Sequence, residues 1–119
     1  MRTVSGFNVD VRRDGSTVVV APSGELDLAT VGQLRDAMGR ADGCAVLVLD
    51  LRGLTFMDSA GLSLVVEEHR RAADVGIEFR VVRGSREVQR LFELTGLADR
   101  LEFTKTEQNP AANGGPPDL

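Results

Sequence analysis

Residues 44–62 read CAVLVLDLRGLTFMDSAGL, and this stretch decides the fold class. Its first six residues, 44–49, are all apolar, which is typical of a strand that is buried on both faces of a sheet. Asp58 and Ser59 belong to the residue types that cap helix N-termini, and a pattern with helical spacing follows them. The stretch therefore predicts a buried strand, a connecting segment and a helix, as in a parallel α/β unit.

The chain before this stretch begins with a hairpin pattern. Apolar and polar residues alternate over residues 7–12, and the Asp-Gly pair at 14–15 is typical of a tight turn. The return strand covers residues 17–21, and we expect Pro22 and Gly24 to end it. The hairpin adds one antiparallel pair to a sheet that is otherwise parallel.

Three helices are predicted from apolar residues at intervals of three and four. The first covers residues 29–41 with Asp27 or Thr30 as its cap, the second ends near Asp74, and the third begins at the cap Ser85. The second helix is expected to bury one stripe of residues: Leu62, Val65, Val66, His69 and Ala73. Its opposite, solvent-facing side would then carry Leu64 beside Ala60, Glu67 and Arg71.

Two further strands are expected, at residues 77–81 and 101–104. The predicted fold class is therefore α/β, with a mixed, mostly parallel sheet of four or five strands and three to four helices. The folded domain would span residues 5–104. Residues 105–119 hold three of the four prolines and one large apolar residue, so we expect a disordered Pro/Gly-rich tail.

The composition excludes several classes of protein. The chain has 119 residues, a net charge of -4, one Cys and one His. One Cys cannot form an internal disulfide, and one Cys with one His cannot build a structural zinc site, so we expect no metal and no cofactor. The acidic balance argues against nucleic acid as a partner. No apolar stretch approaches the roughly 20 residues of a membrane span, and the N-terminus has no signal-peptide pattern, so a cytoplasmic protein is expected.

The segment that joins the buried strand to the second helix is the candidate functional site. Parallel sheets build sites at this edge, and a helix N-terminus there favours negative charge. A phosphate on Ser59 would be tolerated at this position. From spacing alone, however, Asp58 and Ser59 can equally be simple helix caps. Phe56 and Met57 could form an exposed patch with Leu64, or could staple the start of the helix.

Three stretches in this order resemble the STAS domain family, and within it the SpoIIAA-type anti-sigma factor antagonists (anti-anti-sigma factors) of bacteria. They are GELDLAT at 24–30, LDLRGL at 49–54 and FMDSAGL at 56–62. The resemblance covers residues 5–104 and implies the STAS fold.

The resemblance also implies a function. Such a protein binds an anti-sigma factor that is also a serine kinase of the GHKL type, and so frees a sigma factor. The kinase would phosphorylate the serine after the Asp, here Ser59; the phosphorylated form would not bind, and a PP2C-type phosphatase could reverse the change. The chain would be a kinase substrate and not an enzyme, and a monomer or weak dimer. The expected partner-binding residues are Asp27, Phe56, Met57, Asp58, Ala60, Gly61 and Leu64.

Other classes fit less well. A phospho-aspartate receiver needs an acidic pair after its first strand, a nucleotide-binding enzyme needs a phosphate loop, and a serine hydrolase needs G-x-S-x-G; the sequence has none of these. His69 and Cys44 are expected to be packed residues. The remaining alternative has the same fold: a non-switching STAS module, as a scaffold in a stressosome-like assembly or as a subunit of a lipid-transport complex.

Overall fold

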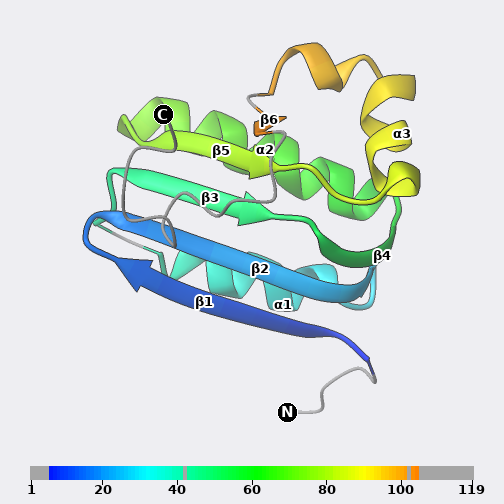
Figure 1. The fold of residues 1–119 in the computed structure, drawn as a ribbon. Helices are drawn as coiled ribbons and strands as arrows, with labels where there is room; N and C mark the ends of the chain where they lie inside the picture. Colours follow the sequence, from blue (N-terminus) through cyan, green and yellow to red (C-terminus); the bar gives the residue numbers. More distant parts are fainter. Residues whose placement is uncertain (1–5, 42, 102, 105–119) are drawn as a thin grey trace.

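Helices α1 and α2 lie together on one face of a mixed β-sheet (Figure 1). The computed structural model describes residues 6–41, 43–101 and 103–104. The strands are β1 (Asn8–Asp14), β2 (Thr17–Leu26), β3 (Val46–Asp50), β4 (Gly53–Met57), β5 (Glu78–Val82) and β6 (Phe103–Thr104). The helices are α1 (Val31–Gly39), α2 (Ser59–Val75), α3 (Arg86–Leu94) and the short 3-10 helix η1 (Leu97–Asp99).

The sheet confirms the predicted architecture. Its main path has the order β1-β2-β3-β5-β6, in which β1 is antiparallel to β2 and the other neighbours are parallel. The sequence pattern does not predict β4, because this short segment resembles a connection. β4 leaves the main path and pairs in parallel with the carboxyl half of β2.

The prediction that Pro22 and Gly24 end the second strand is wrong, because β2 continues to Leu26. The strand changes its partner here: it pairs with β3 up to Val20 and with β4 from Ser23. Pro22 has no N–H to donate, and it lies in the gap between these two pairings. The register shifts directly after Gly24: β2 advances by one residue to Glu25, while β4 advances by two, from Leu54 to Phe56. Thr55 of β4 is therefore the extra residue of a bulge, and β2 runs on through Gly24.

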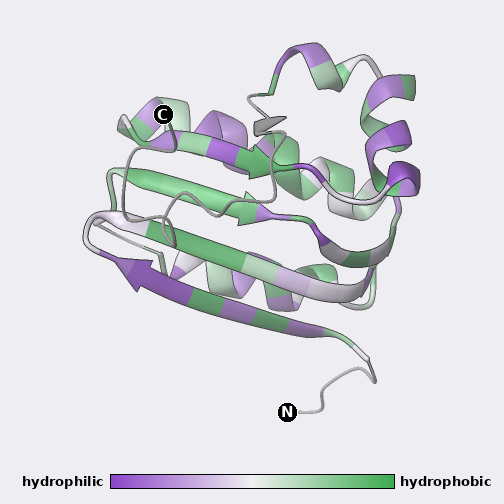
Figure 2. Cartoon of the chain, viewed as in Figure 1, coloured by the Kyte–Doolittle hydropathy of each residue, from purple (hydrophilic) through white to green (hydrophobic). Residues whose placement is uncertain are grey.

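The main core lies between the sheet and the helices. Val20 of β2 and Leu49 of β3 are neighbours in register and are both fully buried. On the other face, Val48 is equally buried in a smaller cluster. Figure 2 shows hydrophobic residues along β2 and β3 and hydrophilic ones on much of β1. The apolar run at 44–49 is therefore part of a central strand that is buried on both faces, as predicted.

The ends of the helices also agree with the sequence. The Ser85 hydroxyl accepts a hydrogen bond from the backbone N–H of Val88 at 3.3 Å, and Gly76 ends α2 in the left-handed conformation. In the described part of the chain, no helix is both long and apolar enough to cross a membrane. The expected disordered tail, 105–119, lies outside the described residues, as does residue 5 at the expected domain boundary.

Helix α2 buries a different side from the predicted one. Its buried residues are Gly61, Leu62, Leu64, Val65, Glu68 and Ala72. Leu64 is only 1% exposed, so it is a core residue and not the solvent-facing contact residue that was expected. The predicted stripe is rotated by about one residue, or roughly 100°. The error arises because Glu68 lies on the buried side, where its carboxylate accepts a hydrogen bond from Arg71 at 2.8 Å.

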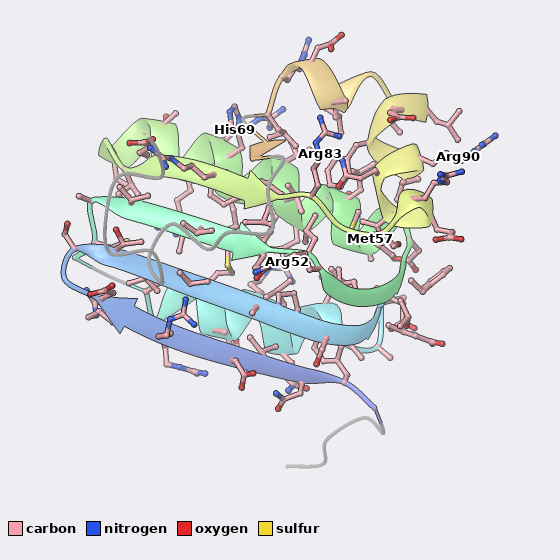
Figure 3. The ribbon with its side chains drawn as sticks, viewed as in Figure 1. Arg52, Met57, His69, Arg83 and Arg90 are labelled. Atoms are coloured by element: carbon pink, nitrogen blue, oxygen red, sulfur yellow. The ribbon has the colours of Figure 1, made fainter. Side chains whose placement is uncertain are left out.

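The single Cys is buried, as expected, whereas the single His is only partly packed. Cys44 is 7% exposed, and its thiol donates to the carbonyl oxygen of Ala41 at 3.4 Å. His69, labelled in Figure 3, is half-buried and does not belong to the buried side of α2, although its ring centroid lies 6.3 Å from that of Phe79.

The buried position of Leu64 can be tested by truncation. We expect Leu64→Ala to lower the free energy of unfolding by about 2–5 kcal/mol, because it removes core contacts and leaves a cavity. Leu28 is 80% exposed and provides the matched control. Leu28→Ala should change the free energy by less than about 0.5 kcal/mol in the same urea titration. Equal effects of the two substitutions would contradict the observed face of α2.

Candidate functional site

The candidate site is the corner where β2 and β4 end side by side. Leu26, the last residue of β2, is in register with Met57, the last residue of β4. The backbone N–H of Asp58 donates to the carbonyl oxygen of Leu26 at 3.2 Å. Asp27 and Asp58 therefore follow neighbouring positions of two parallel strands, and each leads into a helix. This pairing places Asp27, which the family resemblance implies as a partner-binding residue, near the start of α2.

The carboxylates of both aspartates accept hydrogen bonds from backbone N–H groups, but only Asp58 is a helix cap. The Asp27 carboxylate accepts hydrogen bonds from the backbone N–H groups of Ala29 at 3.0 Å and Thr30 at 3.2 Å, and so closes the turn before α1. Of the two cap candidates for that helix, Asp27 and Thr30, the cap position is held by Thr30. The Asp58 carboxylate accepts from the backbone N–H groups of Ala60 at 2.9 Å and Gly61 at 3.3 Å, which the start of α2 would otherwise leave free, so Asp58 and not Ser59 is the cap.

Ser59 is the first residue of α2, and it is exposed. Within the described residues its hydroxyl group makes no hydrogen bond, since Asp58 supplies the cap. The hydroxyl lies at the positive end of the helix dipole, where a negatively charged group is favoured. Chemically, the position suits an acceptor of a phosphoryl group. The described residues contain no cluster of three His, Cys, Asp or Glu side chains that could hold a metal ion.

The other predicted contact residues divide into accessible and buried ones. Phe56 is 47% exposed, and Asp27, Asp58 and Ala60 are partly exposed. Met57, Gly61 and Leu64 are buried and do not form an accessible patch. A Cβ atom on Gly61 would lie 2.7 Å from Met57 and 2.8 Å from Leu26, so this glycine lets α2 approach the strand ends. Of the two interpretations left open for Met57, an exposed patch or a staple at the start of the helix, its burial contradicts the exposed patch.

The structure shows a groove that the sequence analysis did not identify. It lies between β4 and α3, has a volume of about 300 Å³, and is lined by Phe56, Met57, Glu87, Arg90, Leu91 and Leu94. Leu94 is 72% exposed, and Leu28, just after Asp27, is 80% exposed. We call Phe56 and Leu94, the two exposed apolar residues that line the groove, the apolar rim. Figure 3 shows Met57 on β4 and Arg90 on α3 at the same end of the molecule.

The spacing of apolar residues on α3 gives only a weak indication of this groove. Leu91 and Leu94 stand three residues apart on α3, but the sequence alone assigns Leu91 to the core. In the structure Leu91 is only half-buried, and Val88 and Phe92 fill the core instead. The rim can be recognised only once β4 and α3 are known to be neighbours.

The turn that leads from β3 into β4 is held by Asp50 and Arg52. Asp50 is 7% exposed, and its carboxylate accepts from the backbone N–H and the Nε of Arg52, each at 3.0 Å, and from its Nη2 at 2.8 Å. Burial alone raises the pKa of Asp50, but the hydrogen bonds and charge of Arg52, with the charge of Arg12, outweigh it. The pKa therefore lies below its usual value of 3.8. Figure 3 shows Arg52 at the end of β3.

The fold and this corner define the class of protein. Residues 8–110 match the family model of the STAS domain, and the chain belongs to the STAS domain family. The resemblance based on the three sequence stretches is thereby confirmed.

Among its relatives, an anti-sigma-B factor antagonist of Staphylococcus aureus is 32% identical over 101 residues, which are 83% of this chain and 94% of that protein. The crystal structure of an anti-sigma factor antagonist from Mycobacterium paratuberculosis superposes with a TM-score of 0.81 at 27% identity, covering 96% of this chain and 97% of that one. The Bacillus cell fate determinant SpoIIAA in its phosphorylated form has a TM-score of 0.65 at 25% identity, covering 91% and 97%.

The Asp50–Arg52 pair predicts a pH-dependent contribution to stability. Because the pKa of Asp50 is lowered in the folded state, the pair stabilises the protein above the unfolded-state pKa, and this stabilisation is lost as the pH falls through the folded-state value. We expect Arg52→Gln to cost about 1–3 kcal/mol at pH 7, since it leaves a mostly buried carboxylate without its partner. The cost should shrink as the pH falls through the lowered pKa of Asp50, where its carboxylate takes up a proton and no longer needs the partner.

Urea unfolding at pH 7 and at successively lower pH measures this difference. Arg80→Gln is the matched control, because Arg80 pairs with Glu78 at 2.6 Å on a much more exposed site. It should cost less than about 1 kcal/mol. A cost of Arg52→Gln that stays constant with pH would contradict the assignment to Asp50.

Proposed function

We propose that this chain is an anti-sigma factor antagonist, which binds an anti-sigma factor and is released from it when Ser59 is phosphorylated. The observation that carries the proposal is the exposed Ser59 at the start of α2, beside an Asp58 carboxylate that is already engaged as the cap. The relatives that are named anti-sigma factor antagonists support the same role, as does the phosphorylated form of SpoIIAA. The chain acts as a cytoplasmic regulator and kinase substrate, not as an enzyme.

The partner in this proposal is an anti-sigma factor that is itself a serine kinase of the GHKL type. It transfers the γ-phosphoryl group of ATP to the Oγ of Ser59: an O–P bond forms at Ser59, the bond to the β-phosphate oxygen breaks, ADP leaves, and the hydroxyl proton passes to a base of the kinase. The exposed hydroxyl can enter an active site without local unfolding. A PP2C-type phosphatase restores the hydroxyl by hydrolysis and releases inorganic phosphate.

Phosphorylation at this position acts locally. It adds about -1.5 to -2 charges and three acceptor oxygens. The N-terminus of α2 tolerates the negative charge, so the fold is retained. At the docking surface, however, the phosphate meets the carboxylates of Asp27 and Asp58 and must keep its hydration. A loss of only ~3 kcal/mol in binding would weaken the affinity roughly a hundredfold, so no global rearrangement is needed.

The apolar rim and the groove supply the contact surface for the partner. Two of the five exposed large hydrophobic residues in the described chain, Phe56 and Leu94, form the rim, and a third, Leu28, follows Asp27 at the end of β2. A cluster of exposed apolar side chains around a groove marks an interaction surface. Glu87 and Arg90 on the groove wall add charges of both signs. The partner would place an apolar side chain in the groove and lie across Ser59.

Substitution of Ser59 tests the switch. Ser59→Ala is expected to bind the anti-sigma kinase like wild type but to incorporate no phosphate, whereas Ser59→Asp should bind more weakly because it adds a charge at the docking surface. Intact-mass analysis after incubation with the cognate kinase and ATP measures phosphorylation, and calorimetry measures binding.

The matched control is Ser63→Ala, which removes an exposed hydroxyl one helical turn further along α2. It should be phosphorylated as wild type is. Phosphate incorporation into Ser59→Ala at the wild-type level would refute the assignment of the acceptor.

The rim can be tested separately from the acceptor. Leu94→Ala should weaken binding of the unphosphorylated chain to the partner by at least about tenfold, because an apolar side chain that is buried on binding contributes roughly 1.5–3 kcal/mol. Val75→Ala is the control, since Val75 is 58% exposed at the opposite end of α2. It should leave the affinity unchanged. Equal affinities of the two variants would argue against the groove as the contact surface.

A further inference from the structure

The outer strand β1 is an open sheet edge. It is the first strand in the sheet order, so among the described strands it has a neighbour, β2, on one side only. Figure 1 shows it along the outer border of the sheet. It is seven residues long, mostly exposed, and carries Val11 at its centre with 51% exposure. Such an edge presents free backbone N–H and C=O groups that can pair with another strand.

The sequence of β1 is complementary to itself when two copies run antiparallel. Opposed residues in an antiparallel pair point to the same face, so a two-fold axis must pass next to one residue. The strand runs from Asn8 to Asp14, and its middle residue is Val11. Centred there, Asp10 faces Arg12 of the second copy and Arg12 faces Asp10, and all seven residues are paired.

Registers in which the two-fold axis is shifted by one residue in either direction are less favourable, because they oppose like charges. An axis at Arg12 opposes two arginines and places Asp10 against Asp14, whereas an axis at Asp10 opposes two aspartates. Like charges directly opposite one another destabilise a strand pair, and opposite charges stabilise it. The register with the longest overlap is thus also one without any like-charge pair. Charged residues usually protect an edge strand from pairing, but here they select a single partner register.

We propose that the chain associates with a second copy of itself through β1, in an antiparallel pair centred on Val11. The two sheets become continuous, and the helices of both copies lie on the same side. The Val11 side chains meet at the axis, flanked by the two Asp10–Arg12 pairs. One strand pair forms a small interface, so the dimer is weak and depends on protein concentration. Because the two-fold axis reverses the strand direction, the two Ser59 corners lie at opposite ends of the shared sheet.

A charge-swap series on the full chain tests the proposal. Sedimentation velocity from about 1 µM to about 1 mM covers the weak affinities of a small interface. Wild type should shift from monomer to dimer over this range. Asp10→Arg sets an arginine opposite an arginine on both sides of the axis, and Arg12→Asp sets an aspartate opposite an aspartate. Each variant alone should therefore dimerise at least about tenfold more weakly than wild type.

Two combinations of these variants restore opposite charges across the axis and make the test specific. An equimolar mixture of the Asp10→Arg and Arg12→Asp variants opposes unlike charges again and should associate like wild type, as should the double variant. This recovery also shows that the single variants are folded. Asp74→Arg, on the exposed end of α2, is the control and should dimerise normally.

Each contrary result overturns the proposal. A wild-type chain that stays monomeric up to the highest concentration excludes the β1 pair, and so does a dimer that the single variants do not weaken. Failure of the mixture to recover association excludes the register centred on Val11. None of these results bears on Ser59 or on the groove, so the proposed function stands or falls separately.

Discussion

The parallel pairing of β4 with the carboxyl half of β2 is the constraint on which the rest of the structure depends. It brings Leu26 and Met57 to the ends of adjacent strands, so that the aspartates that follow them, Asp27 before α1 and Asp58 as the cap of α2, lie at one corner. This close approach leaves no space for a side chain at Gly61, where a Cβ would lie 2.7 Å from Met57 and 2.8 Å from Leu26. A larger residue there would push α2 away from the strand ends, and the corner would be lost. On the other side of β2, a Cβ on Gly24 would lie 2.1 Å from the carbonyl oxygen of Gly6, and the φ of 102° at Gly24 suits glycine alone.

The same constraint explains why the proposed switch can be local. The carboxylates of Asp27 and Asp58 are held by backbone N–H groups, so they cannot turn away when a third negative group arrives. The corner is therefore rigid before modification, and a phosphate on Ser59 changes the charge and hydration of a surface whose shape stays the same. The Asp50–Arg52 pair contributes from the other end of β4, because it fixes the turn at which β4 begins. In the proposed switch, hydrogen bonds that hold both ends of this short strand would let a single covalent change alter the affinity without changing the shape of the surface.

The sequence predicts most of the fold, and the reasons for its errors are physical. Periodicity predicts elements that bury one face, so the hairpin, the central strand, the three helices and the caps Asp58 and Ser85 are all recognisable. Periodicity fails where a charged residue is buried with a partner: Glu68, bonded to Arg71, shifts the apparent face of α2 and makes Leu64 look exposed. It fails again where a strand exchanges partners, since Pro22 and Gly24 are normally signals for a strand end. Ser59 is found from its motif, but the rim residue Leu94 follows only from the tertiary contact of α3 with β4.

The fold also presents two different edges of the sheet, which expose different chemical groups. The carboxyl end of β2 and β4 offers helix N-termini and exposed apolar side chains, which suit recognition of a partner and a change of charge. The lateral edge along β1 offers unpaired backbone groups and a self-complementary order of charges, which suit association with an identical strand. A phosphate on Ser59 lies next to β4, which pairs with β2 rather than with β1, so it does not enter the seven paired positions of the β1 edge. If both proposals hold, self-association and partner binding can be controlled independently, and the weak dimer would hold two Ser59 corners without blocking either of them.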